Sequence, residues 1–141
     1  MVVNILQTGQ IEEQVSHVLA LIGQPVRVQI LTIIGEREAC VCHLEAALGC
    51  RQASISQHLM VLRKAGLVTT HREGRNIFYR LVEPGVVELL QQAARLAGAD
   101  PDALTRLAES PVDGCTCPHC NPDLDPDLTC QKKTSCSSSR K

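Results

Sequence analysis

The sequence predicts a mainly α-helical domain with one small β-hairpin, an α+β fold class. Three observations predict it. In several segments between residues 11 and 97, apolar residues recur every three or four positions, the period of an amphipathic helix. Two short segments rich in β-branched and aromatic residues flank a turn that contains glycine, the pattern of a hairpin. Phe78 and Tyr79 are the only aromatic residues, so we expect a core of Leu, Val, Ile and Ala.

Four helices are expected before the hairpin. Glycines at positions 23, 35 and 49 are expected to end the first three. Pro25 suits the first turn of the second helix, because its missing N–H has no partner there. The fourth helix follows Gly49 closely and carries an apolar face opposite a polar one. These helices are predicted over residues 11–22, 25–35, 40–48 and 52–64.

The hairpin is expected to use residues 67–72 and 76–81, with the turn at Glu73-Gly74-Arg75. A strong amphipathic helix follows over residues 86–97, and a short one over residues 100–109. Four helices, a hairpin and a further helix are the order of a winged helix-turn-helix, predicted for residues 1–110. Beyond Pro111 the apolar periodicity ends, so residues 111–141 are expected to form a cysteine-rich tail, mobile unless a metal or a partner holds it.

Composition excludes several classes of protein. A chain of 141 residues fits one small domain and a tail, not a two-domain catalytic cleft. No phosphate-binding glycine loop, carboxylate pair or Ser-His-Asp grouping is present, so we expect no enzyme. A thiol oxidoreductase using Cys117 and Cys120 is the weakest alternative, because their motif lacks a βαβ unit. No basic leader and no apolar stretch of about 20 residues is present, which favours a cytoplasmic protein without membrane contact.

Charge is unevenly distributed along the chain. The net charge is -1, from 14 basic and 15 acidic residues. Between Arg51 and Arg80, however, six basic side chains face the single acid Glu73, a net charge of +5. A local positive surface suits the sequence-independent part of duplex DNA binding, in which Lys and Arg displace counterions from phosphates. A solvated polar helix beside a charged hairpin is the simpler alternative.

Residues 52–64 also carry the side chains that base reading needs. Gln57 can hydrogen-bond adenine through two atoms, and the serines can contact bases or phosphates. Arg72 and Arg75 flank the hairpin turn, where they can reach the DNA backbone or minor groove. The candidate DNA-binding residues are Arg51, Gln52, Ser54, Ser56, Gln57, His58, Arg63, Lys64, Arg72 and Arg75.

The segment LGCRQASISQHLMVLRKAGLV (residues 48–68), followed by REGR (residues 72–75) and Tyr79, resembles the arsenical-resistance and metallothionein repressor family, ArsR/SmtB. The resemblance covers about residues 14–97. It implies a homodimeric repressor that binds a palindromic operator and leaves DNA when a metal or metalloid binds. It further implies that the first and last long helices, residues 11–22 and 86–96, form the dimer interface, although an intramolecular core would use the same apolar stripes.

Eight cysteines are the chemically informative residues. In a reducing compartment, closely spaced cysteines indicate metal binding or redox chemistry. The segment EACVCHL (residues 38–44) is similar to the family's inducer-binding box, and a helix N-terminus favours the thiolate forms of Cys40 and Cys42. Thiolates select soft ions such as As(III), Sb(III), Cd(II), Pb(II) or Zn(II). Two buried apolar residues are the alternative. Glu45 stands where one type of arsenic sensor has a third cysteine, so further ligands must come from elsewhere.

The predicted tail offers those ligands at Cys115, Cys117 and, with less support, Cys120. We expect a site that joins Cys40 and Cys42 to Cys115 or Cys117, from the same or the partner subunit. The rival role for the tail is metal scavenging. The leading function is a repressor induced by As(III) or Sb(III), and the alternatives are a Cd(II) or Pb(II) sensor with four thiolates and a thiol redox sensor. No role is assigned to Cys50, Cys130 and Cys136, and Cys50 is expected to be buried.

Overall fold

The computed structural model describes residues 11–106, 115 and 120–123. Helices α1 (Ile11–Ile22), α2 (Pro25–Glu36), α3 (Val41–Leu48) and α4 (Gln52–Lys64) precede the hairpin, as the apolar periodicity predicts. The hairpin consists of β2 (Val68–Glu73) and β3 (Asn76–Leu81), and α5 (Gly85–Leu96) and α6 (Pro101–Thr105) follow it. The expected end of the last helix near residue 109 lies outside the described residues. The winged helix-turn-helix prediction is confirmed.

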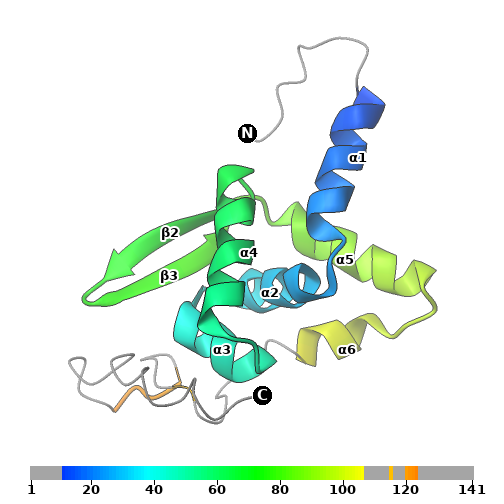
Figure 1. The fold of residues 1–141 in the computed structure, drawn as a ribbon. Coiled ribbons are helices and arrows are strands. Elements are labelled where there is room, and N and C mark those ends of the chain that lie inside the picture. The colour runs from blue at the N-terminus through cyan, green and yellow to red at the C-terminus, as the bar shows by residue number, and fades with distance from the viewer. Residues whose placement is uncertain (1–10, 107–114, 116–119, 124–141) are drawn as a thin grey trace.

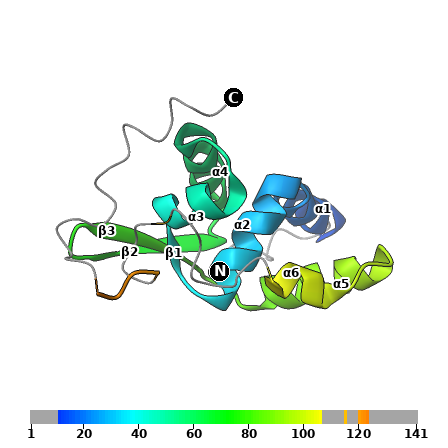
Figure 2. The same cartoon turned by 90° about the horizontal axis from the view of Figure 1, so that it is seen from below.

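A two-residue strand, β1 (Ala39–Cys40), was not predicted. It pairs antiparallel with β3, so that the sheet has the order β1-β3-β2. Figure 2 shows β1 beside β3, between the hairpin and α3. Phe78 of β3 therefore lies opposite Cys40 on one side and His71 on the other. This pairing fixes the segment that contains the Cys40-x-Cys42 motif against the middle of β3.

Gly35 does not end the second helix, and that prediction is wrong. The helix continues to Glu36, and Gly35 lies at a close approach of two helices. A Cβ atom at this position would lie 2.4 Å from Cγ2 of Val87 on α5. By contrast, Gly49 does end α3, with φ at 67°, in the left-handed conformation that glycine tolerates best.

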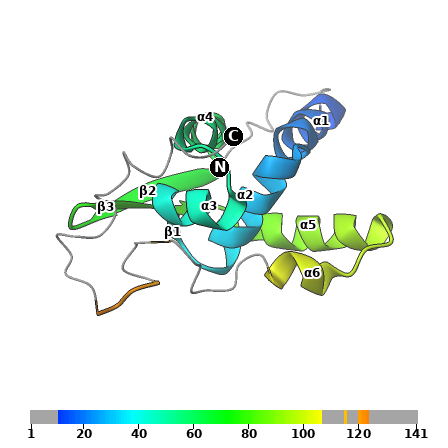
Figure 3. The same ribbon diagram turned by 60° about the horizontal axis from the view of Figure 1, so that its bottom comes forward.

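The core lies where α2, α3 and α4 meet the sheet. Figure 1 shows the hairpin and α5 at opposite ends of the molecule, with α2, α3 and α4 between them, and α1 projecting outward. Figure 3 shows α6 alongside α5. No single described helix is long and apolar enough to cross a bilayer, and α1 and α2 meet that test only as a pair bent by 87°. The largest fully buried side chains are Phe78, Ile30, Leu31, Ile33, Leu44, Ile55, Leu59, Leu62 and His43.

Candidate DNA-binding surface and cysteine cluster

Helix α4 separates an apolar face from a polar one. Ile55, Leu59 and Leu62 are fully buried, at the spacing of four and three residues that one helix face requires. The predicted DNA-contacting residues Gln52, Ser56 and Gln57 are exposed, as is Arg51 just before the helix. Arg63 and Lys64 are exposed in the last turn, where the helix dipole favours positive charge. The helix therefore presents its hydrogen-bonding side chains to solvent.

The two remaining predicted residues of this helix, Ser54 and His58, are half-buried. The His58 ring faces α2, where Nε of Arg27 donates a hydrogen bond to its Nδ1 at 3.2 Å. Arg27 also donates to the carbonyl oxygen of Leu21 at 3.0 Å. Burial, and then the positive charge of Arg27, lower the pKa of His58 below its usual 6.5. His58 thus connects α4 to α2, and Arg27 extends the connection to the end of α1.

The hairpin carries the other predicted DNA contacts. Arg72 near the end of β2 and Arg75 in the turn are both exposed. Gly74 between them adopts a φ of 64°, which permits the tight reversal after Glu73. Because the hairpin projects beyond the helices (Figure 1), both arginines lie at an extremity of the molecule. Helix α4 and the hairpin lie where a winged helix has its recognition helix and its wing, and together they form the candidate DNA-binding surface.

The predicted cysteine motif lies at the junction of β1 and α3. Cys40 precedes the first turn of α3 and Cys42 is within it, and both are buried. Their Sγ atoms lie 2.7 Å apart, further than the roughly 2.05 Å of a disulfide bond. Cys42 is disulfide-bonded. The N-terminus of α3 beside these sulfur atoms favours the thiolate form of a reduced cysteine over its thiol form.

Two cysteines from the far end of the sequence lie against this motif. Cys115 is buried in one cluster with Cys40, Cys42 and Phe78, and Cys120 packs against that cluster. Nδ2 of Asn121 donates a hydrogen bond to the carbonyl oxygen of Cys115 at 2.6 Å, connecting the two described parts of this segment. Cys117, the other predicted ligand, lies outside the described residues.

His43 was not among the residues predicted from the sequence, yet it lies at the centre of this group. Its ring is buried in the first turn of α3. Nδ1 lies 3.2 Å from Sγ of Cys120 and 3.6 Å from Sγ of Cys115. The ligating atoms of these three residues all lie within 4.8 Å of one another, close enough to hold one metal ion. The available signal was a histidine directly after the Cys-x-Cys motif, in an otherwise mostly apolar segment.

Cys50 is half-buried, and its thiol points to the carbonyl oxygen of Leu48 at 3.8 Å. It therefore lies apart from the other described cysteines, in the connection between α3 and α4. Cys130 and Cys136 lie outside the described residues. The cysteine cluster of the described structure thus consists of Cys40, Cys42, Cys115 and Cys120, with His43 as a nitrogen donor.

An apolar surface remains exposed on α1 and α5. Ile11, Val15 and Leu19 form one exposed stripe of α1, and Leu96 at the end of α5 is 90% exposed. Between these helices lies a groove of about 330 Å³, lined mainly by apolar side chains including Val18, Ile22, Val82, Val86 and Leu89. Exposed apolar surface of this extent is typical of an interface with another protein.

Comparison with known proteins identifies the fold's relatives. Residues 24–70 match the family described as bacterial regulatory protein, arsR family. The HTH-type transcriptional repressor SmtB of Mycobacterium tuberculosis is 35% identical over 91 residues, which cover 64% of this chain and 67% of SmtB. The biofilm growth-associated repressor of Agrobacterium fabrum is 40% identical over 78 residues, 55% of this chain and 67% of that protein.

Among solved structures, the transcriptional repressor BigR from Xylella fastidiosa matches with a TM-score of 0.58 at 31% identity, covering 67% of this chain and 96% of BigR. The exposed polar face of α4 and the basic hairpin agree with these matches. The chain belongs to the arsR family of winged-helix DNA-binding transcriptional regulators, and it is not an enzyme.

Proposed function

We propose that this regulator is a dimeric repressor that leaves its operator when As(III) or Sb(III) binds to cysteine thiolates. The ligands are Cys40 and Cys42 together with Cys115, Cys117 and Cys120. One observation carries the proposal: thiols more than 70 residues away along the chain lie beside the Cys-x-Cys motif. A site in the cytoplasm, where thiols stay reduced, would have these sulfurs available as ligands.

The donor set accounts for the choice of inducer. Trivalent arsenic takes three thiolates, and the motif alone supplies two, so at least one further thiol is needed. Cys115 and Cys120 each meet that need from within the same subunit. With four thiolates the same group of residues suits Cd(II) or Pb(II), and His43 adds a nitrogen donor that suits Zn(II). These ions are the alternative inducers.

Coupling to DNA follows from the position of α3. This helix begins at the cysteine motif, packs against α4 and connects to it through Gly49, Cys50 and Arg51. A ligand that pulls the motif toward Cys115 displaces the start of α3, and α4 is the next element along the chain. A metal-bound state with a displaced α4 would fit the operator less well, which is a coupling free energy between the two sites.

Dimerisation is proposed through α1 and α5. Their exposed apolar residues and the groove between them lie at the end of the molecule opposite the hairpin. Two subunits joined there would present two copies of α4, the candidate recognition helix, to a palindromic operator. Cysteine ligands from the partner subunit are not needed in this arrangement, because the described thiols already meet within one chain.

A thiol redox sensor is the second candidate, and the disulfide of Cys42 favours it. In that case oxidation of the thiols, rather than metal binding, would release DNA. The two mechanisms require opposite states of Cys42, because only a reduced sulfur can ligate As(III). Adding excess reductant therefore distinguishes metal-driven release of DNA from release driven by thiol oxidation.

The test measures release of a fluorescent operator duplex, selected from a random pool by the reduced protein. Release is followed by anisotropy under arsenite, Cd(II) or peroxide, each with and without excess reductant. Arsenite in excess reductant should weaken DNA binding roughly 5- to 150-fold, the usual range of allosteric coupling. Cys40→Ser should abolish the effect, while Cys50→Ser, the matched control, should keep it. Release only by peroxide without reductant would contradict the metalloid proposal and support the redox sensor.

A further inference from the structure

A second cluster of metal-ligating side chains lies on the sheet, outside the cysteine group. Glu38 immediately precedes β1, and His71 and Glu73 belong to β2. Cys40, Phe78 and His71 lie opposite one another across the three strands. Side chains along a strand alternate between the two faces of the sheet. Glu38 is two residues from Cys40 and Glu73 is two residues from His71, so both glutamates lie on the same face as those residues. The topology thus gathers three ligand-type residues beside the buried Phe78.

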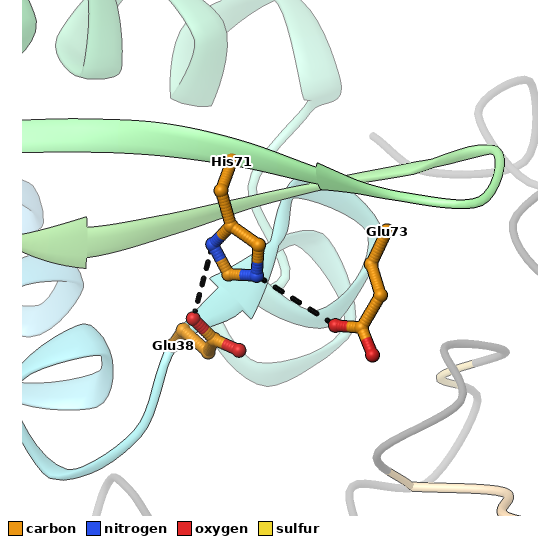
Figure 4. A network of polar contacts seen from close by, with 3 residues as sticks. All are labelled: Glu38, His71 and Glu73. Carbon is orange, nitrogen blue, oxygen red and sulfur yellow. Dashed lines mark ion pairs between the residues drawn. The ribbon is translucent and has the colours of Figure 1, made fainter.

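The three side chains face one another. Nδ1 of His71 lies 3.2 Å from Oε2 of Glu38, and Nε2 lies 3.6 Å from Oε2 of Glu73. Figure 4 shows the imidazole ring between the two carboxylates, one at each nitrogen. One ligand atom from each residue can be chosen so that all three lie within 4.8 Å of one another. Nδ1 is buried and makes no hydrogen bond in the described structure.

The ring of His71 is held in place rather than free to turn. It stacks on the ring of Phe78, with centroids 5.7 Å apart and planes 24° from parallel. Two ligands at about 2.0–2.1 Å from a tetrahedral Zn²⁺ lie about 3.4 Å apart. The distance from Nδ1 to Glu38 is already close to that spacing. Glu73 is 64% exposed, so its carboxylate can rotate toward the same nitrogen without disturbing the core.

The charge of the cluster is unbalanced. Neither carboxylate contacts a lysine or arginine side chain within the part of the chain that the structure describes, and the imidazole is their only ionic partner. Two carboxylates beside one imidazole attract a divalent cation. Imidazole and carboxylate are the ligands that borderline first-row ions accept, whereas As(III) requires thiolates.

We propose that Glu38, His71 and Glu73 form a second metal site, for a divalent cation of the Zn²⁺ class, separate from the thiolates. The three protein ligands leave one tetrahedral position for water. A bound ion would connect the residue two positions before Cys40 to the outer half of β2. It would thereby hold the hairpin against β1.

The experiment titrates the reduced, metal-free, full-length protein with Co²⁺, which replaces Zn²⁺ and absorbs light. Thiolate ligands give an intense sulfur-to-cobalt charge-transfer band in the near ultraviolet, and nitrogen and oxygen ligands give only weak visible bands. We expect one equivalent of Co²⁺ to bind without producing the charge-transfer band. His71→Gln and Glu73→Gln should each lower the affinity for this equivalent at least tenfold. Glu73→Gln changes an exposed side chain, so we expect this variant to fold as the unaltered protein does. His17→Gln, which changes an exposed histidine of α1, is the matched control.

The outcomes separate cleanly. Loss of the band-free equivalent in both variants, with His17→Gln unchanged, supports the site. Unchanged Co²⁺ binding in His71→Gln overturns it, and so does an equal loss in His17→Gln, which would indicate adventitious surface binding. Loss of the charge-transfer band as well would show that the cluster is not a separate site. Because these variants keep all eight cysteines, failure here leaves the thiolate proposal to its own test.

Discussion

Phe78 is the side chain whose removal should damage the fold most. It is fully buried on the central strand of the sheet, beside Cys40, Cys42 and Cys115. Its ring also supports that of His71. Replacing such a residue with alanine removes buried apolar surface and leaves a cavity, so Phe78→Ala should lower the free energy of unfolding by about 3–5 kcal/mol. That is a large part of the roughly 5–15 kcal/mol available to a domain of this size.

The neighbouring residue supplies the control. Ile77 is 42% exposed and points to the opposite side of the same strand. Ile77→Ala should therefore cost less than about 1 kcal/mol. Both variants are unfolded in urea and followed by far-ultraviolet circular dichroism. Reductant and a fixed protein concentration are needed, because disulfide exchange and dimerisation both change the apparent stability.

The placement of Phe78 is tested by comparing the free energies of unfolding of Phe78→Ala and Ile77→Ala. A cost for Phe78→Ala below about 1 kcal/mol, or one equal to that of Ile77→Ala, would contradict the placement of Phe78 at the centre of the sheet. A changed slope of the unfolding free energy with urea would indicate a less compact state instead of a cavity. With an unchanged slope, the midpoint shift measures the burial.

Three further predictions concern pH, a helix end and DNA. Because folding lowers the pKa of His58, the unfolded state binds a proton more readily than the folded state does. The free energy of unfolding should therefore fall as the pH drops below 6.5. His58→Gln should flatten that part of a plot of the urea midpoint against pH. Gly49→Ala should destabilise by about 1–2 kcal/mol because of its left-handed φ. Gly85→Ala should not, because a Cβ there would make only an ordinary contact at 3.9 Å with Oε1 of Glu83. Gln57→Ala should lower base discrimination by about 1–3 kcal/mol, while Lys64→Ala should weaken all sequences and reduce the salt slope by about 1.

Local sequence predicts most of this fold because its boundaries are local. Pro25 and Gly49 mark helix ends, and the alternation around Gly74 marks the hairpin. The missed features depend on distant partners. Strand β1 has only two residues and exists because β3 lies beside it. Gly35 was expected to end a helix, but its missing side chain serves the close approach of Val87.

The candidate site shows the same division. The spacing of Cys40 and Cys42 predicts a pair of ligands, since both lie at one helix start. No spacing predicts that Cys115 lies beside His43, because 72 residues separate them and the contact depends on how the chain returns. Similarly, the exposed face of α4 is predicted by its period, but the turn of His58 toward Arg27 follows from the packing of α2.

The central claim is that cysteines from the end of the sequence complete the inducer site on α3. The most direct measurement is arsenite-driven release of operator DNA, followed by anisotropy in excess reductant, for Cys115→Ser/Cys120→Ser. Its control is Cys130→Ser/Cys136→Ser, which removes two other cysteines of the same region. We predict that the first variant binds DNA normally but needs at least tenfold more arsenite for half-release, while the control responds as the unaltered protein does. An unchanged arsenite response in Cys115→Ser/Cys120→Ser would contradict the claim.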